Sequence, residues 1–196
     1  MNLELHAAAA ANDAAAIRKL LAAGARIEAR DKAKRTALLI ATRANAVEAA
    51  AALIESGADV NAKDNIRDTP FLYAGAEGRL EILRLCLKAG ANLTDTNRYG
   101  GIALIPAAHH GHPDTVRELL QTAIAVDHIN RLGWTALLET IILSDSGPTH
   151  QDILSQLIAA GADVNLAGGE GVRPLAHAKN RGYTEMIRML EAAGAR

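Results

Sequence analysis

The chain has 196 residues and a formal net charge of −1, and it is 49% hydrophobic but only 3% aromatic. The near-zero charge gives no electrostatic basis for binding nucleic acid or an anionic membrane, and no apolar run approaches the roughly 20 residues of a membrane-spanning helix. The N-terminus lacks the basic and apolar regions of an export signal. We therefore expect a soluble cytoplasmic protein, or a periplasmic one if an export signal has been removed.

A short phrase, Gly-Ala followed by a polar residue, recurs along the chain at a nearly fixed spacing. It begins at Gly24, Gly57, Gly90, Gly161 and Gly194, with a degenerate copy at Ala123. The spacings are 33, 33, 33, 38 and 33 residues (57−24, 90−57, 123−90, 161−123 and 194−161). A period of this size predicts a solenoid of stacked repeats, in which each unit packs only against its neighbours.

The first two units cover residues 1–30 and 31–63. No hairpin precedes the first unit, which is typical of a terminal cap. In the second unit Lys34 replaces the glycine expected at the hairpin turn, and the run Lys32-Ala33-Lys34-Arg35 lies in the most basic part of the chain. This run is interpreted either as a solvated surface or as a docking patch.

The next two units cover residues 64–96 and 97–129. Thr69-Pro70 fits a helix start, because threonine caps free amides and proline tolerates the first turn. Cys86 falls among apolar residues, which predicts a small buried side chain rather than a reactive thiol. The fourth unit has Ala123 where the others end in glycine. Either the backbone keeps a positive φ there, at a cost of about 1 kcal/mol, or this repeat ends differently.

The last two units cover residues 130–167 and 168–196, and the second of them is expected to be a C-terminal cap. The fifth unit is five residues longer than the others (38 − 33), and the extra residues are placed at 144–148. Insertions in repeat proteins often lie on the binding face. A neutral insertion is the alternative, because surface loops tolerate extra length cheaply.

These units resemble ankyrin repeats. The family pattern is Asp-x-x-Gly-x-Thr-Pro-Leu-His-x-Ala-Ala-x-x-Gly-His, then an apolar helix and Gly-Ala-Asp-Val-Asn. It is carried most clearly by Asp64, Thr69-Pro70, Gly78, Gly90-Ala91-Asn92 and the run from Gly57 to Asn61. The departures are Lys34, Arg67, Ala123, the insertion and the missing helix-start histidine of the internal repeats. The run Gly133-Trp134-Thr135-Ala136-Leu137 also resembles a bacterial subgroup of the family.

The resemblance implies an all-α ankyrin-repeat solenoid of about six stacked helix-turn-helix units with short projecting β-hairpins. We expect it to form a single domain over residues 1–196. It also implies a monomeric, non-catalytic module that binds another protein through the concave face and hairpin tips of its central repeats. Eight residues are expected on that surface: Tyr73, Arg98, Tyr99, His109, His110, Arg131, Trp134 and Glu139. Binding hot spots favour Trp, Tyr and Arg, but Trp134 and Tyr99 could equally pack against the next hairpin.

Sequence motifs for chemistry are weak. His109, His110 and His112 are the densest cluster of potential metal ligands, but consecutive helical residues point about 100° apart, so neither a metal nor a cofactor is expected. No P-loop, dinucleotide fingerprint or nucleophile elbow occurs. The alternative function is a sensor of a small molecule or peptide, bound in a pocket near Trp134, Glu139, His110 and the insertion. An isolated scaffold without a native partner is a third possibility, which the irregular repeats disfavour.

Overall fold

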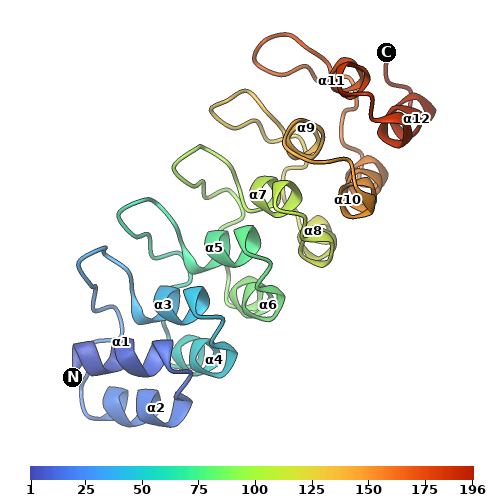
Figure 1. Cartoon of the computed structure of the whole chain (residues 1–196). Helices are drawn as coiled ribbons and strands as arrows, with labels where there is room; N and C mark the ends of the chain where they lie inside the picture. The colour runs from blue at the N-terminus through green and yellow to red at the C-terminus, as the bar shows by residue number, and fades with distance from the viewer. The chain divides into compact units, whose positions relative to one another are not determined.

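The computed structural model describes residues 1–196 and contains twelve α-helices and no strands (Figure 1). The helices are α1 (Asn2–Ala10), α2 (Ala14–Ala22), α3 (Ala37–Arg43), α4 (Val47–Glu55), α5 (Pro70–Ala76), α6 (Leu80–Lys88), α7 (Leu104–His109), α8 (Pro113–Leu120), α9 (Ala136–Ile142), α10 (Pro148–Ala159), α11 (Pro174–Arg181) and α12 (Thr184–Ala192). They form six pairs, which confirms the predicted all-α repeat architecture. None of the twelve has the length and apolar character that crossing a bilayer requires.

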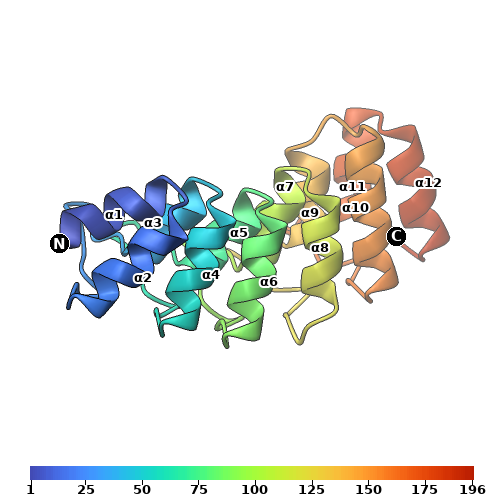
Figure 2. The ribbon, with the colours of Figure 1, turned by 90° about the horizontal axis from the view of Figure 1, so that it is seen from below.

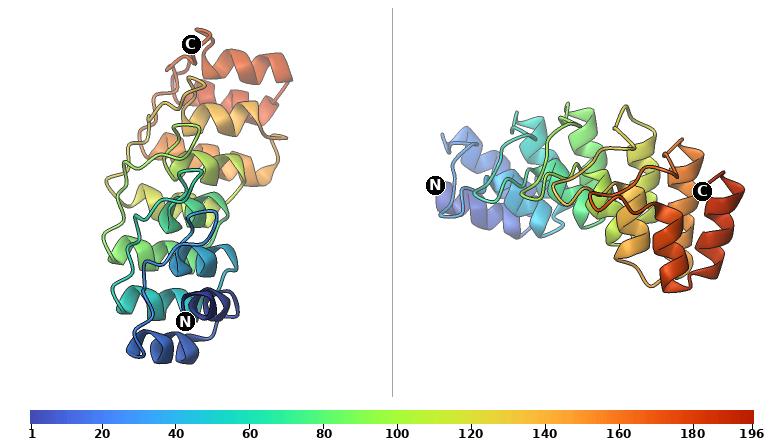
Figure 3. Two further views of the ribbon diagram at one scale, coloured as in Figure 1. Left: turned by 90° about the vertical axis from the view of Figure 1, so that its left-hand side faces the viewer. Right: turned by 90° about the horizontal axis from the view of Figure 1, so that it is seen from above.

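The chain divides into two compact parts. From here on 'unit' means one of these two parts, and 'repeat' means one of the six stretches predicted from the period. The first unit comprises Met1–Gly75 with Arg79–Arg98, and the second comprises Ala76–Gly78 with Tyr99–Arg196. In the first unit, α1 packs on α3, while α2, α4 and α6 form a second row (Figure 2). In the second unit, α7, α9 and α11 form one row and α8, α10 and α12 the other. The two helices of a pair lie side by side, as Figure 3 shows for α11 and α12.

Threonine side chains begin the first helix of three repeats. The Oγ1 atoms of Thr36, Thr69 and Thr135 accept hydrogen bonds from the backbone N–H groups three residues later, at 3.3, 3.0 and 3.2 Å. Each bond satisfies one of the amides left free at a helix N-terminus. The helices that follow are almost wholly buried, and small alanines among them let neighbouring pairs approach closely.

Helices α4, α6 and α10 end in the same way, and α8 is an exception. Gly57, Gly90 and Gly161 have φ values of +90°, +85° and +88°, the left-handed conformation that closes a helix. Ala123 is absent from the residues with positive φ. Helix α8 stops at Leu120 instead, and the Thr122 hydroxyl donates to the Leu119 carbonyl at 2.6 Å and accepts from the Ile124 amide at 3.2 Å. The fourth repeat therefore ends differently, as the second sequence-based alternative stated.

Replacing Ala123 with glycine should not stabilise the protein. Because φ is not positive at this site, glycine relieves no strain and only adds conformational freedom to the unfolded chain. The free energy of unfolding should therefore fall by about 0.4–1 kcal/mol. Thermal unfolding of Ala123→Gly beside wild type measures this. Lys34→Gly, at a φ of +61°, is the positive control and should be stabilised. A raised melting temperature for Ala123→Gly would contradict the geometry.

The projecting hairpins are tight turns rather than strands. In three of them one polar side chain closes the turn: Oδ1 of Asp31, Asp64 or Asn130 accepts the backbone N–H groups two and four residues later, at 2.8–3.1 Å. A backbone bond joins the same two ends, such as Asn130 N–H to the Trp134 carbonyl at 3.0 Å. One such pair is too short to count as a strand, so the predicted β-hairpins exist only as turns.

The insertion is shared between a loop and a helix. Helices α9 and α10 are joined by residues 143–147, whereas α7 and α8 are joined by residues 110–112. Helix α10 has 12 residues where α4 and α6 each have 9. Two extra residues therefore lengthen the link (5 − 3) and three lengthen the helix (12 − 9). Pro148 begins α10 at a position where its missing N–H costs nothing.

Close approach of neighbouring hairpins restricts one position to glycine. A Cβ at Gly133 would lie 2.5 Å from the backbone nitrogen of Gly169 and 2.6 Å from its Cα, whereas a Cβ at Gly171 would meet nothing within 4 Å. Both residues have a positive φ, +78° and +75°. Strain is therefore common to the two sites, but the steric clash is confined to Gly133.

Gly133→Ala should destabilise the protein by about 2–4 kcal/mol, because backbone strain and overpacking combine. Gly171→Ala, the matched control, should cost only about 1 kcal/mol. Urea denaturation of both variants measures the difference. Equal losses would show that the hairpins move apart easily.

Candidate binding surface

The hairpin at residues 130–134 is held by one buried side chain. Asn130 is 7% exposed, and its Oδ1 closes the turn through the amides of Leu132 and Trp134. Its Nδ2 donates to Oε1 of Glu139 on α9 at 2.7 Å. The hairpin is thereby tied to the helix behind it, and its tip is presented on a fixed base.

Exposed apolar side chains lie on two neighbouring hairpins of the second unit. Tyr99 is 53% exposed, Leu132 55% and Ile129 48%. Tyr99 and Leu132 occupy equivalent positions, 33 residues apart, and the backbone N–H of Arg131 donates to the Tyr99 carbonyl at 2.9 Å. These three residues are called the apolar tips below. Leu132 and Ile129 were missed in the sequence analysis, although the equivalence of Leu132 with Tyr99 was readable from the period.

Trp134 is placed differently from Tyr99. Its side chain is half-buried, and a Cβ at Gly168 would lie only 3.2 Å from its Cδ1 atom and 3.5 Å from Cδ1 of Leu138. Trp134 thus packs against the following hairpin and presents only part of its ring. Tyr99 has the larger free surface of the two.

Glu139 is the most perturbed carboxylate of the second unit. It is 6% exposed, and burial raises the pKa of its carboxyl to about 7, although the hydrogen bond from Asn130 acts in the opposite direction. Oε2 lies 3.6 Å from Nδ1 of His109. Burial, together with the nearby His110 and His150, lowers the pKa of His109. Both shifts act toward the neutral forms, so the contact between Glu139 and His109 is not a strong ion pair.

Three further histidines of this region contact the backbone of neighbouring turns, two of them through hydrogen bonds. Nδ1 of His110 lies 2.6 Å from the Ala76 carbonyl, and Nε2 of His150 lies 3.0 Å from the His109 carbonyl. The His112 ring is packed so tightly on Gly78 that a Cβ there would lie 2.6 Å from its Nδ1. No group of three or more His, Cys, Asp or Glu side chains is arranged to hold a metal ion. The cluster links successive repeats.

The eight predicted residues fall in both units. Tyr73 and Arg98 belong to the first and the other six to the second. Tyr73 is half-buried beneath the Arg43 guanidinium, whose carbon lies 4.4 Å from the ring centroid, which is a cation–π contact. Arg98, His110 and Arg131 are exposed, His109 is half-buried and Glu139 is buried. None of the eight lines the pocket of about 500 Å³ in the first unit, which is formed around Leu3, His6, Arg26 and Arg30.

Glu139 should make the stability of the protein depend on pH. Its carboxyl ionises near 4.5 in the unfolded chain and at about 7 when folded. Between these values only the folded state keeps the proton, so the contribution of Glu139 to stability falls as pH rises through this window. Glu139→Gln keeps an acceptor for Asn130 but cannot ionise, so it should gain on the order of 3 kcal/mol over wild type across the window.

Urea denaturation of wild type and Glu139→Gln at about pH 4 and about pH 8 tests this expectation. Glu170→Gln changes an exposed carboxylate of the same unit and is the matched control. The same pH dependence in both variants would contradict the assignment.

Comparison with known proteins agrees with this architecture. The family model described as ankyrin repeats (3 copies) matches residues 5–97 and 71–168. The chain therefore belongs to the ankyrin repeat family. Ankyrin repeats are typically protein-binding modules and are generally non-catalytic.

The relatives found include bacterial ankyrin proteins. An ankyrin repeat domain from Acinetobacter baumannii AYE is 55% identical, with a TM-score of 0.95 and 98% of each chain covered. The Enterococcus ankyrin repeat protein EF0377 is 39% identical, with a TM-score of 0.93 and coverage of 97% of this chain and 98% of that one. The ankyrin repeat protein YahD of Escherichia coli (strain K12) is 42% identical over 59 residues, which are 30% of this chain and 29% of YahD. The predicted bacterial ankyrin repeat family is confirmed.

Proposed function

We propose that the chain binds another protein through the hairpin tips of its second unit and the adjoining residues of helices α7 and α9. The observation that carries the proposal is the pair Tyr99 and Leu132, more than half exposed at equivalent positions of hydrogen-bonded neighbouring hairpins. Single exposed apolar residues are common on any surface. Two at the same position of adjacent, hydrogen-bonded hairpins offer apolar surface to one partner, and the exposed Ile129 lies in the same region of the chain.

The scaffold beneath the apolar tips is rigid, which favours binding. Asn130 fixes the turn and bonds to Glu139, and Gly133 lies against Gly169 with no room for a side chain. A partner therefore meets a surface that is already ordered and loses little entropy in ordering it. Arg131 and the solvent-exposed part of the Trp134 ring supply residue types that dominate binding hot spots. His109 and His110 extend the surface along α7 and its end.

The ligand-pocket alternative receives less support from the same geometry. The Glu139 carboxylate is buried and is engaged by Asn130, a scaffold residue. Trp134 covers the next hairpin rather than an open cavity. Both side chains have structural partners that a small ligand would have to displace. Tyr73 and Arg98 belong to the first unit. They remain predicted contact residues, and a single substitution at each position tests its contribution to binding.

The proposal is tested by using the purified protein to capture its partner from an extract of the source cells. The wild type is compared with the double variant Tyr99→Ser, Leu132→Ser. Both side chains are largely exposed, so far-UV circular dichroism should stay unchanged while recovery of the partner falls about tenfold, the equivalent of about 1.4 kcal/mol. Gln121→Ala, Ser155→Ala alters exposed residues at the end of α8 and on α10 and is the matched control.

Quantitative mass spectrometry identifies the proteins bound by wild type and control but not by the variant. The purified partner is then titrated against all three proteins. Equal affinity for wild type and variant would overturn the proposed surface. A loss of helical signal in the variant would instead show that Tyr99 and Leu132 stabilise the hairpins.

A further inference from the structure

The hairpin tips of the first unit form a second surface, and its chemistry differs from that of the apolar tips. We infer that it binds an acidic, extended segment of a protein. The surface comprises four exposed cationic residues around two neighbouring hairpins, Arg30, Lys32, Lys34 and Arg67, and is called the basic ridge below. This inference does not depend on the function proposed for the second unit, because it uses none of its residues.

The two hairpins of the basic ridge are neighbours held together by the backbone. The Asn65 N–H donates to the Ala33 carbonyl at 3.0 Å. The Arg30 guanidinium donates to the carbonyls of Lys34 and Lys63, so it spans from one hairpin to the start of the next. The cations therefore share one continuous surface.

Backbone conformation gives an independent indication of function. Lys34 and Arg67 have φ values of +61° and +70°, while the same turn position holds Gly100, Gly133 and Gly171 in the other hairpins. A residue with a side chain costs on the order of 1 kcal/mol there relative to glycine. The two strained positions are adjacent in the stack, and both carry a cation. Strain kept where a glycine would relieve it is typical of binding sites.

Three carboxylates near the ridge are engaged by partners within the chain. Asp31 pairs with Arg35 at 2.7 Å, and Asp95 pairs with Lys63 at 2.7 Å. Asp64 is 8% exposed and accepts two backbone amides. Lys32, Lys34 and Arg67, in contrast, make no ion pair within the chain. These three acids are engaged within the chain, whereas the three cations are exposed.

An acidic protein segment fits this surface better than nucleic acid does. Ile66, between the cations, is 38% exposed and offers an apolar contact that suits a peptide side chain. No aromatic residue occurs at positions 30–35 or 63–68, so bases would have no ring to stack on. Exposed ion pairs contribute little each, which predicts weak binding that salt suppresses.

The test is a fluorescence-anisotropy titration with a labelled peptide of glutamate, aspartate and leucine. A second peptide, with glutamine and asparagine in place of the acids, is the neutral probe. Wild type should bind the acidic peptide at least about tenfold more tightly than the neutral one at low salt, and the difference should shrink at about 0.2 M salt.

The decisive variant is Lys34→Gly, Arg67→Gly. It should bind the acidic peptide about tenfold more weakly and yet unfold at a higher temperature than wild type, because glycine relieves the positive φ at both sites. A structural role for these residues would not produce a loss of binding together with a gain in stability. Lys34→Arg, Arg67→Lys keeps the charges and should keep the affinity.

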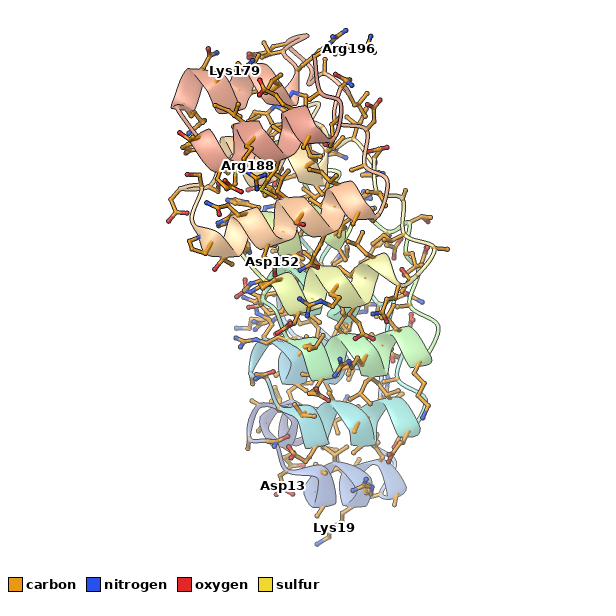
Figure 4. The ribbon with its side chains drawn as sticks, turned by 90° about the vertical axis from the view of Figure 1, so that its right-hand side faces the viewer. Asp13, Lys19, Asp152, Lys179, Arg188 and Arg196 are labelled. Atoms are coloured by element: carbon orange, nitrogen blue, oxygen red, sulfur yellow. The ribbon has the colours of Figure 1, made fainter.

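The matched control is Lys19→Gln, Lys88→Gln. It also removes two positive charges from the first unit, at exposed positions on α2 and at the end of α6 (Figure 4 labels Lys19). Equal loss of affinity in the control and in the glycine variant would show non-specific attraction and overturn the inference. Equal binding of the two peptides by wild type, or tighter binding of a single-stranded oligothymidine than of the acidic peptide, would also overturn it.

Discussion

The rest of the structure depends on main-chain hydrogen bonds between successive hairpins. Within the first unit Asn65 donates to Ala33 at 3.0 Å, and within the second Arg131 donates to Tyr99 at 2.9 Å and Gly169 to Gly133 at 3.1 Å. Such bonds bring the backbone of one repeat directly against that of the next, and only glycine permits the closest of these approaches. Some side chains at the tips, such as Tyr99 and Leu132, are left exposed, where partners can reach them.

The same constraint assigns the buried polar groups to the scaffold. A buried polar atom that loses water must find a hydrogen-bond partner, and here the partners come from the next turn or helix. The buried Asn130 joins a hairpin to Glu139, and the half-buried His150 and the exposed His110 also reach carbonyls of neighbouring turns. A cluster that looks reactive as a list of residues is thus a set of structural links. Glu139, whose pKa is raised by burial to about 7, stays close to a change of charge.

Two adjacent positions of the repeated turn can carry different side chains without altering the fold. The residue before the positive-φ position is Ile66 in the first unit and Leu132 in the second, and the positive-φ residue itself is Arg67 or Gly133. Because each turn is closed by its own Asp or Asn side chain, these substitutions leave the backbone path intact. The proposed apolar tips and the proposed basic ridge are two uses of equivalent places, and each repeat contacts only its neighbours.

Much of the fold followed from the sequence alone, because each repeat folds through short-range interactions. The period located the units, threonine marked the helix starts at Thr69 and its equivalents, and glycine marked most helix ends. The sequence did not decide how the repeat ends at Ala123, since φ there depends on the hydrogen bonds of Thr122.

The sequence also could not show which of Trp134 and Tyr99 packs against the next hairpin and which stays exposed, and it did not point to Leu132 and Ile129. What covers a side chain is decided by the adjacent repeat: Gly168 packs against Trp134, while more than half of the Tyr99 side chain stays exposed. The sequence by itself thus determined the family and the repeat architecture, whereas the exposure of the tips and the burial of Glu139 were decided only by tertiary packing, which depends on contacts between residues distant in the chain.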